Sequence, residues 1–214
     1  MKKTILFLAV ATLMLASCRN EQEPATTANT ADVVMQNILS RKSVRQYTGD
    51  TIPGNILEDI LRAAQAAPSG RDWRPWSFVV VTPDQDLEAI FGADNFNMRM
   101  YKQAGAIVVL CADTVHMGPT RDNPDGPAVA QVNHLWRDDL GAATENLLLA
   151  VEAYGLGACW TACYPYPERM NPVREALQLP ASVVPYAVVP VGVPAGDTQP
   201  KDKWDPSRVH YNRW

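Results

Sequence analysis

Three cations flank a hydroxyl group in the segment 40–47, which reads SRKSVRQY. Arg41, Ser43 and Arg45 occupy alternate positions, so an extended backbone would turn their side chains to one side. Two guanidinium groups and a hydroxyl on one face suit a phosphate with an adjacent polar ring edge, because guanidinium binds phosphate oxygens through paired hydrogen bonds. A solvated basic loop is the alternative interpretation of the same residues.

The familiar catalytic and metal-binding patterns are missing from the sequence. His116, His134 and His210 lie in or beside polar segments and lack the spacing of metal ligands. Ser69 and Gly70 do not form a G-x-S-x-G elbow, and no G-x-G-x-x-G follows a predicted strand. The sequence therefore predicts no catalytic side chain and no metal site.

Two cysteines in the C-terminal half of the chain are separated by three residues, whereas the cysteines of thioredoxin-like motifs are separated by two. Cys159 and Cys163 therefore fit buried, small apolar side chains better than a redox pair.

The elements that must position these residues alternate only loosely between helix and strand. Apolar, β-rich runs predict strands over 76–82, 106–112 and 183–193. The last run and its end contain three prolines, which indicate an edge strand or irregular ends: Pro185, Pro190 and Pro194. We therefore expect an α+β fold rather than a doubly wound sheet.

Helical periodicity predicts helices over four segments: 32–39, 53–67, 133–154 and 167–177. The segment 133–154 is apolar around most of its circumference, so this helix should be buried in the core or in a subunit interface.

The N-terminus has the pattern of an export signal. Lys2 and Lys3 precede an apolar run over 5–15, and this run ends in a Leu-Ala-Ser-Cys sequence that resembles a bacterial lipobox. We predict a lipoprotein signal peptide over 1–17, a lipidated Cys18 with a polar tether over 18–31, and one domain over 32–214. An uncleaved N-terminal anchor is the alternative. The predicted location is membrane-anchored, on the periplasmic or cell-surface side.

Charge excludes one class of partner. The 214-residue chain has 47 % hydrophobic and 20 % charged residues and a net charge of −4, and removal of the signal peptide with its two lysines changes that charge to −6. Proteins that bind nucleic acid through phosphate contacts need a basic surface, so we expect no nucleic-acid partner.

Five motifs in order carry a family resemblance. Residues 41–47 match R-[RK]-S-[VI]-R-x-[FY], and residues 67–76 match A-P-S-G-x-N-x-Q-P-W with two departures. Residues 139–150 match D-x-x-A-x-x-x-N-x-x-L-A, and 155–160 match G-L-G-x-x-W. A G-x-P at 192–194, two lysines and an H-Y-x-x-W at 210–214 complete the series. The chain resembles the nitroreductase family of FMN-dependent oxidoreductases over about 33–214.

This resemblance implies an α+β fold with a central, mostly antiparallel sheet flanked by helices. It also implies a domain-swapped homodimer that binds FMN in a cleft at the dimer interface. The implied activity is ping-pong hydride transfer through flavin N5, from NAD(P)H to nitroaromatic, quinone-like or similar conjugated acceptors. An exported protein would lack access to cytoplasmic NAD(P)H, so the signal peptide and the usual donor are in conflict.

The resemblance also assigns the cofactor-binding residues. Arg41 and Ser43 would hold the FMN phosphate together with Lys201 or Lys203, and Lys42 is also assigned to the cofactor site. Arg45 would reach the ribityl chain and the N1–C2=O edge of the flavin, where a cation stabilises the reduced form.

Two further segments are assigned to the flavin ring. Pro68, Ser69 and Gly70 would contact it from the partner subunit. The stretch Trp160, Thr161, Ala162 would lie against the ring, with a backbone N–H near N5. Plain core packing is the alternative for Trp160.

The two departures concern charge. Asp72 and Arg74 stand where the family pattern has Asn and Gln. Asp72 near the flavin would lower its reduction potential unless Arg74 or Arg71 neutralises it.

Two other functions remain open at this point. The chain could be a flavoenzyme of the same fold with other chemistry, such as reductive dehalogenation or dehydrogenation, in which residues 116–133 would form the substrate lid. It could also be a non-catalytic surface lipoprotein.

Overall fold

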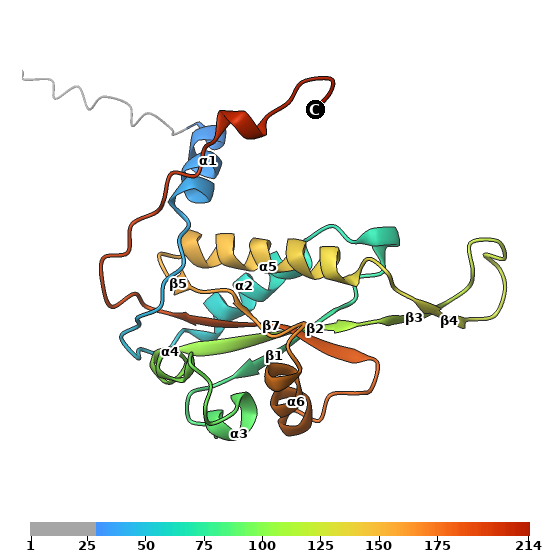
Figure 1. The fold of residues 1–214 in the computed structure, drawn as a ribbon, viewed down its shortest axis with the longest axis horizontal. Helices are drawn as coiled ribbons and strands as arrows, with labels where there is room; N and C mark the ends of the chain where they lie inside the picture. The colour runs from blue at the N-terminus through green and yellow to red at the C-terminus, as the bar shows by residue number, and fades with distance from the viewer. Residues whose placement is uncertain (1–28) are drawn as a thin grey trace, which may run out of the picture.

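The centre of the computed structural model, which describes residues 29–214, is a five-stranded antiparallel sheet (Figure 1). The strand order is β1-β2-β7-β5, and β6 also pairs with β7. The strands are β1 (Trp76–Val81), β2 (Ala106–Asp113), β5 (Gly157–Ala158), β6 (Thr161–Ala162) and β7 (Val183–Gly192). The predicted α+β class and the antiparallel sheet are confirmed.

Helices cover both faces of the sheet. The helices α2 (Gly54–Gln65) and α5 (Trp136–Ala153) lie on one face, and α3 (Leu87–Phe91), α4 (Met98–Gln103) and α6 (Pro167–Ala176) lie on the other (Figure 1). Periodicity did not predict α3 and α4, because one or two turns are too short to show a helical repeat.

Strand β2 joins the two halves of the core. Ile107, Val109 and Cys111 belong to the cluster beneath α3, α4 and α6, and the intervening residues belong to the cluster beneath α2 and α5. Successive side chains of a strand point to opposite faces, so a strand that is apolar throughout must be covered on both sides.

Of the two interpretations of the prolines in the final strand, an edge position or irregular ends, the edge position is wrong. β7 pairs with β2 along its length and with β5 and β6 on its other side. Its prolines are tolerated where pairing is interrupted: Pro190 lies opposite the residues that separate the short strands β5 and β6, and Pro185 faces a register shift at Leu110/Cys111. The expected irregularity is present, but within the strand.

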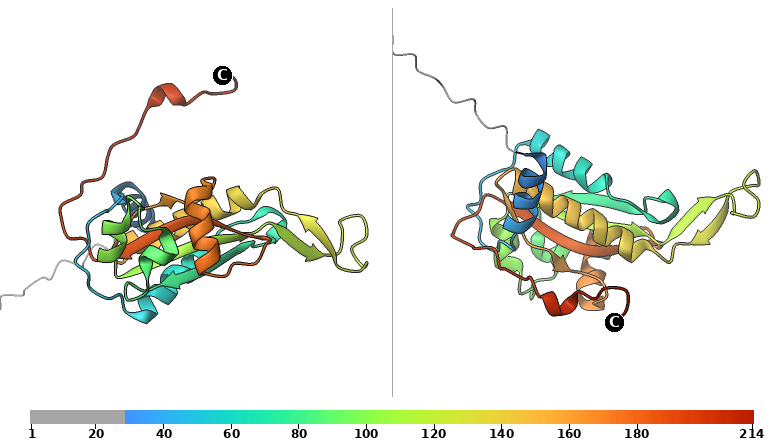
Figure 2. Two further views of the ribbon diagram at one scale, coloured as in Figure 1. Left: turned by 60° about the horizontal axis from the view of Figure 1, so that its bottom comes forward. Right: turned by 90° about the horizontal axis from the view of Figure 1, so that it is seen from above.

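The segment proposed as a lid forms a two-stranded hairpin. β3 (Val115–Gly118) pairs with β4 (Val129–Val132), and the hairpin projects from the body of the molecule (Figure 2).

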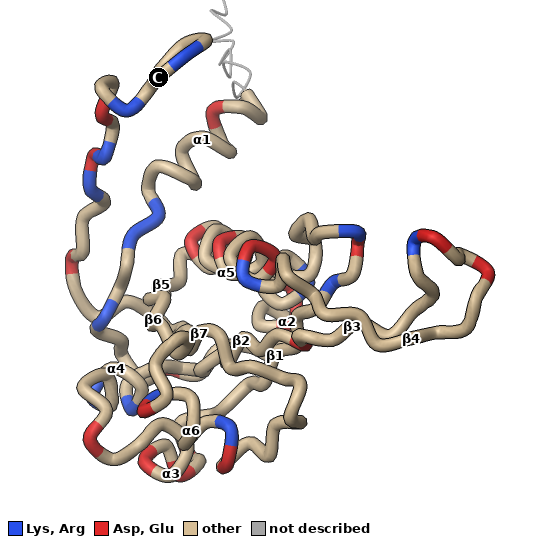
Figure 3. Tube along the Cα trace, turned by 45° about the vertical axis from the view of Figure 1, so that its right-hand side comes forward, with Lys and Arg blue, Asp and Glu red and all other residues tan. Residues whose placement is uncertain are grey.

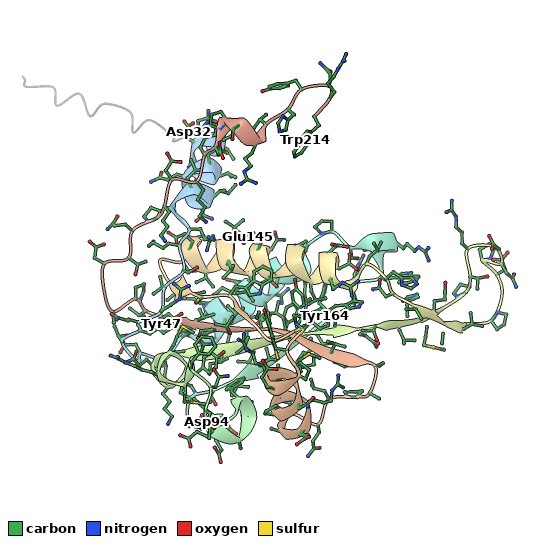
Figure 4. All side chains as sticks on the ribbon, viewed as in Figure 1. Asp32, Tyr47, Asp94, Glu145, Tyr164 and Trp214 are labelled. Atoms are coloured by element: carbon green, nitrogen blue, oxygen red, sulfur yellow. The ribbon has the colours of Figure 1, made fainter. Side chains whose placement is uncertain are left out.

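Both ends of the described chain leave the body on the same side. The helix α1 (Thr30–Ser40) has no buried residue, and the residues from Ala195 to Trp214 are all exposed. Asp32 and Trp214 mark these two projecting ends (Figure 4).

The predicted signal peptide, Cys18 and almost all of the predicted tether lie outside the described residues. Within residues 29–214, no helix is long and apolar enough to span a bilayer.

Candidate functional site

A basic cavity forms where the segment after α1 meets the C-terminal extension. Its volume is about 250 Å³. It is lined by Arg41, Lys42, Ser43, Arg45, Thr198, Gln199, Lys201 and Lys203. Figure 3 shows the basic residues of these two stretches, far apart in sequence, on neighbouring parts of the chain. The structure therefore brings six of the residues predicted to bind FMN, Arg45 among them, to one cavity, which we call the basic pocket.

The backbone of the basic segment is held by the edge of the sheet. Ser43 forms a parallel bridge with Ala158, and the Val44 N–H donates to the Ala158 carbonyl at 2.9 Å. Val44 is 2 % exposed and packs so closely on Gly157 that a Cβ there would lie 2.7 Å from the valine Cβ. Because Val44 points into the core, the residues on either side of it are free to line the pocket.

The buried Tyr47 ends this anchored segment. Its hydroxyl lies 2.7 Å from the Val44 carbonyl and 3.1 Å from the Pro190 carbonyl. Burial raises the pKa of Tyr47, so this hydroxyl stays protonated and serves as a donor.

Carboxylates of α5 balance only part of the positive charge. Arg41 Nε lies 3.5 Å from Glu145, and Lys42 Nζ lies 3.0 Å from Glu152. Within residues 29–214, no carboxylate lies within 4 Å of the charged nitrogens of Arg45, Lys201 or Lys203. The pocket therefore keeps an excess of positive charge that suits a phosphate.

The stretch 160–162 continues along the same edge of the sheet. Thr161 is three residues beyond Ala158, which corresponds to roughly 10 Å along a strand. The N–H groups of Cys159 and Cys163 point inward to carbonyls of β7. Since N–H groups alternate between the two edges of a strand, those of Trp160 and Ala162 point away from β7. The edge beside the basic pocket thus offers backbone donors to a bound molecule.

Trp160 is also a packing residue. Its ring is half-buried and lies edge-on to Tyr186, with 5.8 Å between ring centroids. The ring therefore contributes to the core under α5, whereas the backbone of the same residue lies at the exposed edge.

The loop with Pro68, Ser69, Gly70 and Asp72 is not part of the basic pocket. It lies at the other end of α5 (Figure 1), where the Gly70 N–H donates to Asp139 at 2.7 Å. Asp139 and Glu152 are 13 residues apart on one helix, or about 20 Å. The described chain by itself therefore assembles only part of the predicted site.

The charge of Asp72 is neutralised inside its own loop. Arg74 donates from Nε to Oδ1 at 2.7 Å and from Nη2 to Oδ2 at 2.5 Å, and this bond lowers the pKa of Asp72. Arg71, Asp72 and Arg74 have φ values of 57°, 56° and 47°, which non-glycine residues seldom adopt. The structure thus satisfies the condition under which Asp72 would not depress a flavin potential.

The three described cysteines are buried and unpaired. Burial raises the pKa of Cys159, and raises the pKa of Cys111 and Cys163 to about 12. A thiol reacts as its thiolate, so these groups serve as small core side chains.

Sequence reasoning missed two kinds of residue at the site. Thr198 and Gln199 line the pocket, and their closeness to Lys201 in sequence could have indicated them. Arg169 donates to the Ala162 carbonyl at 3.0 Å, and no sequence signal connects these two residues.

An antiparallel sheet with helices on both faces defines an α+β protein, and its pocket at one edge carries a charge that suits an anion. The model of the Nitroreductase family matches residues 38–193, and the chain belongs to this family. A Methanothermobacter thermautotrophicus protein named as an NADH dehydrogenase/NAD(P)H nitroreductase is 33 % identical, covering 85 % of this chain and 87 % of its own.

Solved structures agree with this assignment. An NADH dehydrogenase/NAD(P)H nitroreductase from Bacteroides thetaiotaomicron is 37 % identical, with a TM-score of 0.73, covering 85 % of this chain and 98 % of that one. A Desulfovibrio desulfuricans nitroreductase in complex with FMN is 26 % identical, with a TM-score of 0.67, covering 85 % and 97 %.

Proposed function

We propose that this protein is an FMN-dependent oxidoreductase that reduces nitroaromatic, quinone-like or similar conjugated acceptors. The observation that carries the proposal is the basic pocket. Four residues of the segment 41–45 and two lysines some 160 positions later line one cationic cavity of about 250 Å³. Because the chain belongs to the Nitroreductase family, we assign this cavity to the phosphate of FMN.

The residues present fit FMN. Arg41, Ser43 and the two lysines suit its phosphate, because charged donors form the strongest hydrogen bonds to phosphate oxygens. Roughly 10 Å of strand edge separates the residue paired with Ser43 from Thr161, and this distance leaves room for the ribityl chain. The outward N–H groups of Trp160 and Ala162 then suit the acceptor atoms of the ring.

When bound, FMN would supply hydride transfer through N5, with donor and acceptor reacting in turn. Arg45 would place a fixed positive charge at the N1–C2=O edge, where it favours the reduced flavin. No acid or base side chain is assigned, because the redox chemistry belongs to the cofactor.

We propose that a second copy of the chain completes the site. On α1, five large apolar side chains are 44–67 % exposed: Val33, Val34, Met35, Ile38 and Leu39. A dimer would cover them and bring the loop 68–72 of one subunit toward the pocket of the other. Replacement of Leu39 with Glu should shift a dimer toward monomer in analytical ultracentrifugation, and a wild-type monomer would refute this part.

We also propose that the protein is an exported lipoprotein anchored through Cys18. A membrane electron carrier or another extracytoplasmic reductant would then replace NAD(P)H as the donor. Cys18→Ala should release the protein from the membrane fraction, whereas a cytoplasmic wild-type protein would overturn the proposal.

The test of the main proposal is the visible spectrum of purified residues 19–214. The expected result is a yellow protein with flavin absorption that bleaches on reduction and returns when menadione or nitrobenzene is added. A colourless protein that does not take up added FMN would overturn the proposal.

A further inference from the structure

One arginine on α6 contacts the strand edge that is proposed to face the flavin. Arg169 Nη1 donates to the Ala162 carbonyl at 3.0 Å. Its guanidinium lies 4.3 Å from the ring centroid of Tyr166 and 5.3 Å from that of Phe96. Both rings are exposed, and the contacts with them restrict the position of the Arg169 side chain.

The bonded carbonyl belongs to a residue whose backbone faces outward. The N–H and C=O of one residue in an antiparallel strand point to the same edge. The inward N–H of Cys163, which donates to Tyr186 at 3.1 Å, places both polar groups of Ala162 on the edge away from β7. Since Arg169 occupies the carbonyl, the N–H is the group that Ala162 offers to a bound molecule.

Neighbouring residues of this stretch are held from other directions. The Trp160 ring packs on Tyr186. The Thr161 hydroxyl donates to the Val188 carbonyl at 2.5 Å and lies 2.8 Å from the Tyr101 hydroxyl. These contacts fix the two faces of β6. Its outer edge, by contrast, is held through the arginine.

We infer that Arg169 is a positioning residue: it holds the Ala162 carbonyl and thereby keeps the backbone of this residue in the orientation that directs the Ala162 N–H at the flavin ring. The inference rests on the proposed function, because it takes the bound molecule to be FMN. Within the described residues, no carboxylate lies within 4 Å of the charged nitrogens of Arg169. Its guanidinium donates instead to the Ala162 carbonyl. A surface ion pair therefore does not explain where this side chain lies.

The same helix offers a matched control. Arg174 is also on α6 and donates from Nη1 to a backbone carbonyl, that of Pro180, at 3.1 Å. Removal of Arg174 therefore deletes an equal charge and a similar bond, but away from β6.

The experiment has two measurements on three variants: Arg169→Ala, Arg169→Lys and Arg174→Ala. The first is amide hydrogen exchange of residues 160–163 in FMN-free protein. The second is the FMN dissociation constant from flavin fluorescence. We expect R169A to speed exchange in this segment and to raise the dissociation constant about tenfold. R169K should give a partial effect, because lysine keeps the charge but loses the planar, stacked donor, and R174A should match wild type.

Two results would overturn the inference. One is wild-type exchange and FMN affinity in R169A, and the other is an R174A effect as large as that of R169A. If R169A does not fold, wild-type behaviour of R169K in both measurements would overturn it. A wild-type protein that binds no FMN would refute the proposed function, while the exchange measurement would still decide whether Arg169 holds this edge.

Discussion

The basic pocket and the loop 68–76 both carry family motifs, but their side chains are used in opposite ways. In the pocket, Arg45, Lys201 and Lys203 face a cavity without carboxylate partners among residues 29–214. In the loop, Asp72 is paired with Arg74, and the Gly70 N–H is bonded to Asp139.

The basic pocket is therefore suited to binding a ligand, and the loop is suited to supporting the fold. Cations held together without partners repel one another, so such an arrangement stores electrostatic energy that an anion releases. The polar groups of the loop already have partners, either within the loop or on α5, so the loop presents its shape rather than its charge to a second subunit. We therefore expect changes in the pocket to affect mainly FMN affinity and changes in the loop to affect mainly stability.

The largest expected effect is on FMN affinity in the pocket. Arg41→Ala and Arg45→Ala should each cost about 2 kcal/mol of FMN binding, or roughly 30-fold, because each removes charged hydrogen bonds to the ligand. Isothermal titration of FMN-free protein measures this loss. Arg62→Ala, which removes an exposed arginine paired with Glu58 on α2, is the control. Unchanged affinity in both pocket variants would refute the assignment.

The next effect is on stability, and it comes from the loop. A Cβ at Gly70 would lie 2.4 Å from Leu135 Cδ1. Gly70→Ala should therefore destabilise the protein by about 1–3 kcal/mol, since the neighbour must move, and Tm should fall by roughly 2–4 °C per kcal/mol. Thermal unfolding without FMN checks this.

Gly54 provides the matched control, because a Cβ there meets nothing within 4 Å. Gly54→Ala should leave Tm unchanged or slightly raised, as alanine favours helix over glycine. If G70A unfolds like wild type but loses FMN as strongly as R45A, the contrast between the two regions fails.

The smallest effect concerns the Asp72–Arg74 pair, which is exposed to solvent and screened. Pairing lowers the pKa of Asp72, so its contribution to stability is present above the unfolded pKa of about 3.9 and is lost as pH falls through the folded value. Asp72→Asn should lower Tm less than G70A does at pH 7, and the difference from wild type should vanish at strongly acidic pH.

Glu58→Gln removes a similarly exposed carboxylate and provides a comparison for that titration. A pH-independent effect of D72N would show that the side-chain shape, rather than the ion pair, supports the left-handed backbone of this loop.

Much of the fold followed from local patterns. The long apolar runs predicted β1, β2 and β7, and helical spacing predicted α1, α2, α5 and α6 to within a few residues. The edge prediction for β7 failed because a proline shows only that one backbone N–H donor is missing. It does not show whether a neighbouring strand is absent. Pro190 lies opposite the gap between two short strands, β5 and β6, whose positions the sequence does not indicate.

The sequence by itself determined the chemistry of the basic segment, since alternation of Arg41, Ser43 and Arg45 puts three phosphate-binding groups on one side of an extended chain. Residue pattern alone did not place Lys201 beside them, and only the family resemblance implied it, because that contact depends on where β7 ends and the chain turns back. Only the tertiary structure decided that Asp72 is neutralised and that Arg169 holds Ala162. Both are directional side-chain bonds, whose partners depend on loop geometry rather than on residue type or periodicity.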